Sequence, residues 1–156
     1  MIQRIQTLYL LLATALMSLT LFLPLATIWT GTEDIVVKAF SVDVKSFSFA
    51  LPLPLYMGII LSITTLLPFV TIFLFKRRMA QIRLCVSEIV LLIGSAAFIA
   101  LYCYRLCDIL SELTNNLIFT LGFAALMPVV AIIFIVLAMR GVARDEALVR
   151  SLDRIR

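Results

Sequence analysis

The sequence predicts an all-α membrane protein, a four-transmembrane-helix bundle in up-down order, and two observations carry this prediction. The chain of 156 residues is 63% hydrophobic and 14% charged, whereas soluble domains are nearer half apolar and a quarter charged. Its apolar residues also fall into four runs of about 20 residues or more, which is the length that crosses a bilayer. We expect one integral membrane domain over residues 1–156.

The first predicted span covers residues 5–28 and is too long for the apolar core of a secretory signal, which is about 7–15 residues. Trp29 follows it as an interfacial anchor. Residues 29–53 are more polar, and between Val42 and Leu51 apolar and polar residues alternate with a period of two. The segment Ile35–Val37 can supply a partner strand. We therefore expect a small β-hairpin-like loop on the outer face of the membrane.

Residues 54–75, 84–104 and 117–139 are the second, third and fourth predicted spans. A basic turn over residues 76–83 and a polar connection over residues 105–116 separate them. The tail, residues 140–156, has an apolar stripe at helical spacing and a basic face with Arg144, Arg150 and Arg154. This pattern predicts an amphipathic helix lying on the anionic inner leaflet, and docking onto a cytoplasmic partner or back onto the basic turn remains the alternative.

Basic residues are concentrated on one side of the predicted topology. Ten lie on the side of the termini and the basic turn, and only Lys38, Lys45 and Arg105 lie on the other. Short loops rich in lysine and arginine stay in the cytoplasm. We expect both termini to be cytoplasmic.

Glu88 is the only acid inside a predicted span and is therefore the leading candidate functional residue. One interpretation is a proton or cation site. The other is a carboxylate that reaches the nearby surface and pairs with Lys76, Arg77 or Arg83. Because Glu88 lies about one turn from the cytoplasmic end of the predicted third span, the sequence favours the structural interpretation, since the penalty is greatest at the bilayer centre.

Two further pairs lie near the outer end of the third span. Arg105 and Asp108 are three residues apart and are candidate functional residues, although an interfacial ion pair is the simpler interpretation. Cys103 and Cys107 suggest a redox pair, but cysteines four apart on a helix are poorly directed for a disulfide, so we expect free thiols. The chain has no histidine and no catalytic motif, and we expect no metal, cofactor, nucleic acid or enzymatic activity.

The two terminal segments carry a family resemblance. Residues 1–13 read MIQRIQTLYLLLA and residues 145–156 read DEALVRSLDRIR. The chain resembles, from end to end, an uncharacterised family of short four-span membrane proteins of unknown function from Bacteroidetes. The resemblance implies a multi-pass protein of a bacterial inner membrane, with the outer loop in the periplasm, and it brings no ligand or catalytic residue.

These observations leave more than one class of function open. We expect a non-enzymatic structural, accessory or scaffolding subunit whose partners are the lipid bilayer and either another membrane protein or a second copy of the chain. The alternative is a small oligomeric transporter or channel with Glu88 as the proton or cation coupling site. A thiol redox protein is a third hypothesis.

Overall fold

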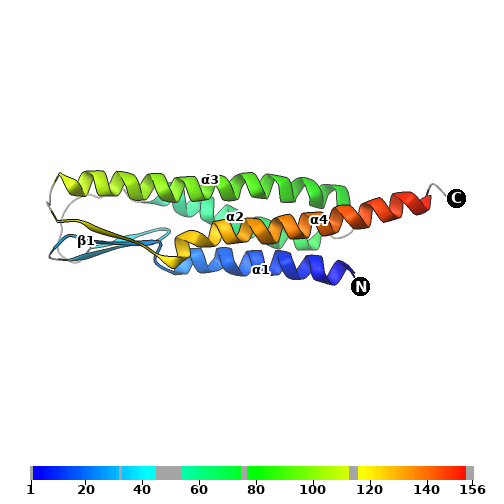
Figure 1. Cartoon of the computed structure of the whole chain (residues 1–156), viewed down its shortest axis with the longest axis horizontal. Coiled ribbons are helices and arrows are strands. Elements are labelled where there is room, and N and C mark those ends of the chain that lie inside the picture. Colours follow the sequence, from blue (N-terminus) through cyan, green and yellow to red (C-terminus); the bar gives the residue numbers. More distant parts are fainter. Residues whose placement is uncertain (1, 32, 45–53, 75–76, 113–115, 154–156) are drawn as a thin grey trace.

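In the computed structural model, four antiparallel helices form a ring and a four-stranded sheet extends one end of it (Figure 1). The structure describes residues 2–31, 33–44, 54–74, 77–112 and 116–153. The N- and C-termini lie at the end of the bundle opposite the sheet. We call these two ends the terminal end and the sheet end.

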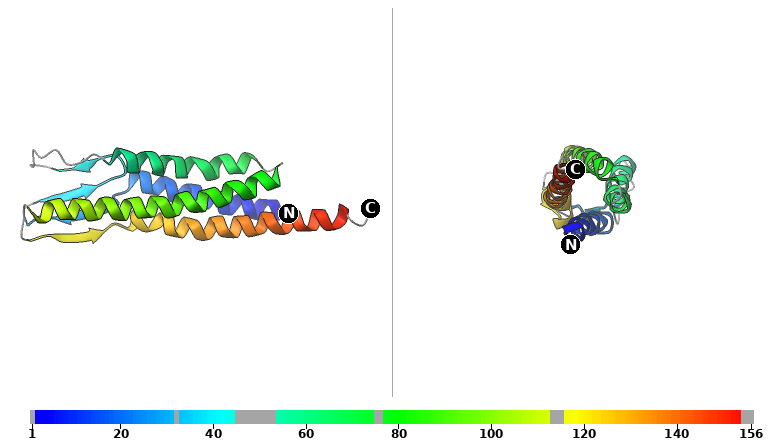
Figure 2. Two further views of the ribbon diagram at one scale, coloured as in Figure 1. Left: turned by 90° about the horizontal axis from the view of Figure 1, so that it is seen from above. Right: turned by 90° about the vertical axis from the view of Figure 1, so that its right-hand side faces the viewer.

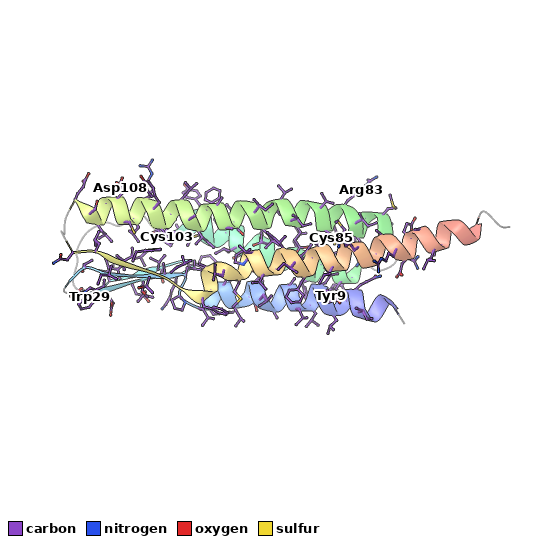
Figure 3. The ribbon with its side chains drawn as sticks, in the orientation of Figure 1. Tyr9, Trp29, Arg83, Cys85, Cys103 and Asp108 are labelled. Atoms are coloured by element: carbon purple, nitrogen blue, oxygen red, sulfur yellow. The ribbon has the colours of Figure 1, made fainter. Side chains whose placement is uncertain are left out.

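The first helix, α1 (Ile2–Phe22), ends two residues before Pro24, so the predicted helix over residues 5–28 is too long. Proline disfavours the helical conformation of the preceding residue and has no N–H to donate. The chain then continues as strand β1 (Ala26–Trp29). Trp29 lies at the outer tip of this strand and cannot anchor the end of α1 (Figure 3).

Strands β2 (Asp34–Val37) and β3 (Val42–Asp43) confirm part of the predicted hairpin. β2 pairs antiparallel with β1, with Trp29 opposite Asp34, and β3 pairs antiparallel with β2. The turn between β1 and β2 needs Gly31, which has a φ of 85°, a conformation that glycine adopts without steric cost. Residues 45–53, which carry most of the predicted alternation, lie outside the described residues.

The fourth strand, β4 (Ile118–Leu121), comes from the beginning of the predicted fourth span and corrects it. It pairs antiparallel with β1, so the sheet order is β3-β2-β1-β4. Its β-branched and aromatic residues favour a strand. Gly122 lies very close to the segment that follows α1. A Cβ at this position would lie 2.4 Å from the carbonyl oxygen of Pro24. The N–H of Gly122 donates to the carbonyl oxygen of Leu25 at 2.8 Å, which continues the pairing of β1 with β4 toward the bundle.

The last helix, α4 (Met127–Asp153), follows a short 3-10 helix, η1 (Phe123–Leu126), and starts later than the predicted residue 117. It then continues past residue 139 without a break (Figure 1). No proline interrupts this region, and Gly141 is accommodated against α1. The predicted separate amphipathic helix on the membrane surface is therefore wrong for residues 140–153, which extend the fourth helix. Arg154 lies outside the described residues.

The two middle helices differ in length. α2 (Leu55–Phe73) agrees closely with the predicted span 54–75. α3 (Arg78–Ser111) has 34 residues, about 51 Å at 1.5 Å per residue, and exceeds the predicted span 84–104 at both ends. It includes most of the predicted basic turn and half of the predicted polar connection, because arginine, glutamine and leucine are good helix formers outside lipid as well as inside it. α3 therefore runs beside both the other helices and the sheet (Figure 1).

Each helix packs against two neighbours, in the order α1–α2–α3–α4 and back to α1 (Figure 2). Buried residues recur every three or four positions, so one face of each helix points into the ring. The outward faces are apolar too; on α2, exposed residues include Ile59, Ile63, Leu66, Phe69 and Phe73. All four helices are long and apolar enough to cross a membrane.

Candidate functional site

The inward face of α3 carries an unusual series of polar side chains. Its buried residues are spaced by three or four positions: Gln81, Cys85, Glu88, Leu92, Ser95, Ile99, Cys103, Leu106 and Leu110. Among them Gln81, Glu88 and Ser95 repeat every seven residues, about 10.5 Å along the helix. Figure 3 shows Cys85 and Cys103 on the side of α3 that faces the other helices, and Arg83 and Asp108 on the opposite side.

Glu88 is fully enclosed in the bundle, with 0% of its surface exposed. Within the part of the chain that the structure describes, neither carboxyl oxygen has a hydrogen-bond partner. Arg77 and Arg83 are exposed and do not pair with it, and Lys76 lies outside the described residues. The interpretation that Glu88 reaches the surface is therefore wrong, because the seven-residue repeat of α3 turns its side chain inward.

Glu88 also lies much deeper than the sequence suggests. Thr64 is nine residues before the end of α2 at Phe73, and Glu88 is ten residues after the start of α3 at Arg78. In an antiparallel pair with a short connection, these positions lie about 14 and 15 Å from that connection, at equal height. Because Thr64 is the middle residue of the 19 in α2, Glu88 is at mid-height of the bundle. The predicted depth of about one turn is wrong, because α3 begins before residue 84.

Oxygen atoms of α2 lie at the height of Glu88. The hydroxyl of Thr64 donates to the carbonyl oxygens of Ile60 at 3.1 Å and Leu61 at 2.9 Å, and its oxygen can still accept. Pro68 is inside α2 and has no N–H, so the carbonyl oxygen of Thr64 lacks its normal helical donor. A carboxylate at the same height as a hydroxyl and a carbonyl oxygen supplies the kinds of oxygen that bind a proton or a hard cation. No group of three or more histidine, cysteine or acidic residues occurs among the described residues.

Two polar residues lie between Glu88 and the terminal end. Thr71 of α2 and Gln81 of α3 are both buried, and they are two and three residues from the ends of their helices. The buried positions of α4 and of the middle of α1 are apolar, whereas the buried polar residues of α1, Gln6 and Thr20, lie near its two ends; the apolar positions include Leu10, Ala13, Met17, Ala131, Ile135 and Ala138. The polar residues of α2 and α3 therefore form a polar wall that runs from the terminal end past the centre. The sequence already showed the part on α3 in the seven-residue spacing of Gln81, Glu88 and Ser95.

The other predicted residues do not join this site. Arg105 and Asp108 are exposed on the outer turns of α3, and the salt bridges among described residues do not include one between them. Arg105 instead lines an apolar groove of about 390 Å³ between α2 and α3 with Tyr56 and Tyr102. Cys85, Cys103 and Cys107 are free, in agreement with the prediction of free thiols.

The predicted basic tail residues lie at the terminal end. Arg144 is exposed on α4, where it lines a crevice between α1 and α4. Arg150 lies in the last turns of α4, and Arg154 is outside the described residues. Arg144 therefore does not belong to the same region as Glu88.

Comparison with known proteins gives a family and no activity. A family model described as Domain of unknown function (DUF4293) matches residues 2–155. No curated protein matches the chain significantly. No solved structure does so either.

Proposed function

We propose a function on the premise that the chain belongs to the family described as a domain of unknown function, DUF4293. In this proposal the four helices cross a bacterial inner membrane, with the termini in the cytoplasm and the sheet in the periplasm. The apolar outward faces of all four helices support insertion, because soluble proteins seldom expose such continuous apolar surface. The basic residues of the terminal end, among them Arg77, Arg83 and Arg140, support the orientation.

Within the membrane, we propose that Glu88 takes up and releases a proton or a small cation, and that the protein is a small transporter or channel without enzymatic activity. The observation that carries this proposal is the burial of both unpartnered carboxyl oxygens at mid-height. An unpaired buried polar group costs about 1–3 kcal/mol, and an ionised group costs more. A bundle with only a structural role would be more stable with leucine at this position, so Glu88 serves an exchange with solvent.

The polar wall gives this exchange a direction. Thr71 and Gln81 lie between Glu88 and the terminal end, whereas on its other side Leu61 and Leu92 come before the next buried polar residue of α3, Ser95. We propose that Glu88 exchanges with the cytoplasm along Thr71 and Gln81. Release toward the sheet end then requires the helices to move apart.

Flux through reconstituted vesicles tests the proposal. The parent protein in vesicles with an imposed pH or sodium gradient should dissipate it, and Glu88→Gln should abolish this flux. Glu112→Gln is the matched control, because Glu112 follows the same helix but is exposed. The transport proposal would be refuted if the parent protein carried no flux of protons, Na⁺ or K⁺. It would also be refuted if Glu88→Gln left the flux unchanged.

The sheet supports a second candidate, an accessory or scaffolding role. β4 is an edge strand, and its apolar side chains are exposed: Ile118 by 62%, Phe119 by 44% and Leu121 by 49%. An exposed apolar edge is a template for another strand. The opposite edge, β3, carries the ion pair of Asp43 with Lys38 and is poorly suited to such pairing. We propose that a second copy or another membrane protein pairs with β4.

Cross-linking in native membranes tests this second candidate. Phe119→Lys with Leu121→Lys should abolish any cross-linked complex, because both residues lie on one face of β4. Ser41→Lys, beside the charged edge, should leave it intact. A complex that survives the β4 variant would exclude this edge as the contact surface.

A further inference from the structure

A crevice of about 430 Å³ opens at the terminal end between α1 and α4, away from Glu88. Its two halves differ in polarity. Tyr9 and Leu137 line the part nearer the middle of the bundle, Arg140 and Arg144 follow toward its end, and Leu148 lies about one turn beyond Arg144. The order from Leu137 to Arg144 matches the order of acyl chain and phosphate in a phospholipid leaflet.

The floor of the crevice is held by part-buried polar contacts. Gln6, only 6% exposed, donates from its amide nitrogen to the Oδ2 atom of Asp145 at 2.8 Å. Arg78 of α3 donates to the carbonyl oxygen of Asp145 at 3.2 Å. Gly141 allows the close approach of the two helices, because a Cβ there would lie 2.8 Å from the Cγ atom of Gln6. The crevice is thus a built feature in which α1, α3 and α4 meet.

These contacts leave the two arginines of the crevice available. The carboxylate of Asp145 is engaged by Gln6, and no ion pair of Arg140 or Arg144 occurs among the described residues. The two arginines are four residues apart on α4, so their side chains lie on one face, with Cβ atoms about 6 Å apart. Two guanidinium groups at that spacing can bind one phosphate through paired N–H groups.

We propose that this crevice binds a phospholipid with a net negative headgroup from the cytoplasmic leaflet. The phosphate lies between Arg140 and Arg144, and an acyl chain follows Leu137 and Tyr9 toward the middle of the membrane. Basic crevices between membrane helices on the cytoplasmic side suit such headgroups. The inference rests on the membrane insertion proposed above and is independent of ion exchange at Glu88.

Native mass spectrometry with defined lipids tests the site. The purified protein is titrated in detergent with phosphatidylglycerol and, separately, with phosphatidylcholine. Arg140→Gln with Arg144→Gln should weaken phosphatidylglycerol binding about thirtyfold, because each basic residue near the surface contributes about 1 kcal/mol and 1.4 kcal/mol is tenfold. Arg77→Gln with Arg83→Gln is the matched control. It removes the same charge from the same end, outside the crevice, and should change binding less than about threefold.

The outcomes separate the possible sources of binding. Equal weakening of phosphatidylglycerol binding by both double variants would show general attraction to anionic lipid and would overturn the site. Unchanged binding in Arg140→Gln with Arg144→Gln would overturn it too. Displacement of the lipid from the parent protein by millimolar inorganic phosphate would assign the crevice to free anions instead. If the double variant does not fold, Arg144→Gln alone should weaken binding about fivefold. Glu88→Gln should keep the lipid, whatever its effect on flux.

Discussion

The acidic side chains of the sheet end and of the bundle interior differ in exposure and in hydrogen bonding. Asp43 of the sheet is exposed and accepts a hydrogen bond from the Nζ atom of Lys38 at 2.6 Å. Glu88 of the bundle is enclosed and has no hydrogen-bond partner among the described residues. The exposed pair orders a local turn, whereas the buried acid lowers the stability of the helices around it. The difference teaches that folding alone does not account for the buried acid, and exchange with solvent is the role that we propose for it.

The largest effect is expected where the two regions join. Gly122→Ala places a Cβ against the backbone carbonyl oxygens of Pro24 and Leu25, at 2.4 and 2.8 Å, and these atoms cannot turn aside. We expect a loss of about 3 kcal/mol in the free energy of unfolding, as for other severe overpacking. Trp29, the only tryptophan, lies in β1 and reports the loss of the sheet by fluorescence.

Gly94→Ala is the control for that experiment. A Cβ on Gly94 meets nothing within 4 Å, and the residue lies inside α3. Alanine should therefore stabilise the protein slightly, by at most about 1 kcal/mol. Equal losses at Gly94 and Gly122 would contradict the close approach of the sheet and the bundle.

Replacing the buried acid should have the next largest effect and the opposite sign. Glu88→Leu removes two unpartnered oxygens from the interior and should raise the free energy of unfolding by about 2 kcal/mol. Unfolding in mixed micelles measures this change. Ser95→Ala is the control on the same face; its hydroxyl donates to the carbonyl oxygen of Leu92 at 2.8 Å, so the change should stay near 0.6 kcal/mol, about the average for such bonds in membranes. Destabilisation by Glu88→Leu would mean that Glu88 has a structural partner.

A smaller change in the free energy of unfolding is expected when hydroxyl groups of α2 are removed. Thr65 donates to the carbonyl oxygen of Met17 on α1 at 3.3 Å as well as to that of Leu61 at 2.7 Å. Thr65→Val should cost about 0.6 kcal/mol in the same unfolding assay. Thr71 donates only within its own helix, to the carbonyl oxygen of Leu67 at 2.8 Å, so Thr71→Val should cost less. Equal costs would remove the contribution of the contact between α1 and α2.

The smallest effect concerns the exposed acid. The hydrogen bond from Lys38 lowers the pKa of Asp43 below its ordinary value of 3.8. A lowered pKa in the folded state means that the pair stabilises the sheet above pH 3.8 and that this stabilisation is lost as the pH falls through the lowered pKa. Carbon-13 NMR of the Asp43 carboxyl should show the lowered midpoint, and Lys38→Ala should raise it. An unchanged midpoint would show that the pair does not persist in solution.

The sequence predicted the helices well because hydropathy and length suffice to recognise a helix that is long and apolar enough to cross a membrane. The ends of the helices were predicted poorly, since a helix can continue beyond the apolar run from which it was predicted. Arg78 and Ser111 extend α3 beyond the predicted span, and only Pro24 gave a usable end signal, which the length of the apolar run concealed. Strands β1 and β4 were missed because apolar residues next to a span read as helix; their pairing joins segments distant in the chain.

The sequence predicted the central residue of the candidate site but not its position in the bundle. Glu88 was identified as the acid inside a span, but its depth was counted from the wrong helix start and its side chain was expected to reach the surface. The positions of Gln81 and Ser95, seven residues on either side, place all three on one face of a helix. Which face points inward depends on how α2 and α4 pack against α3, and this information is not local to α3.

Labelling by carbodiimides tests most directly that Glu88 is a protonatable carboxyl in an apolar interior. A hydrophobic carbodiimide enters lipid and adds to protonated carboxyl groups, whereas a charged, water-soluble one reaches exposed acids. We predict that peptide mass spectrometry will find the hydrophobic reagent on Glu88 and not on Glu112, and the charged reagent on Glu112 and not on Glu88. Modification of Glu88 by the charged reagent to the same extent as Glu112 would contradict the account.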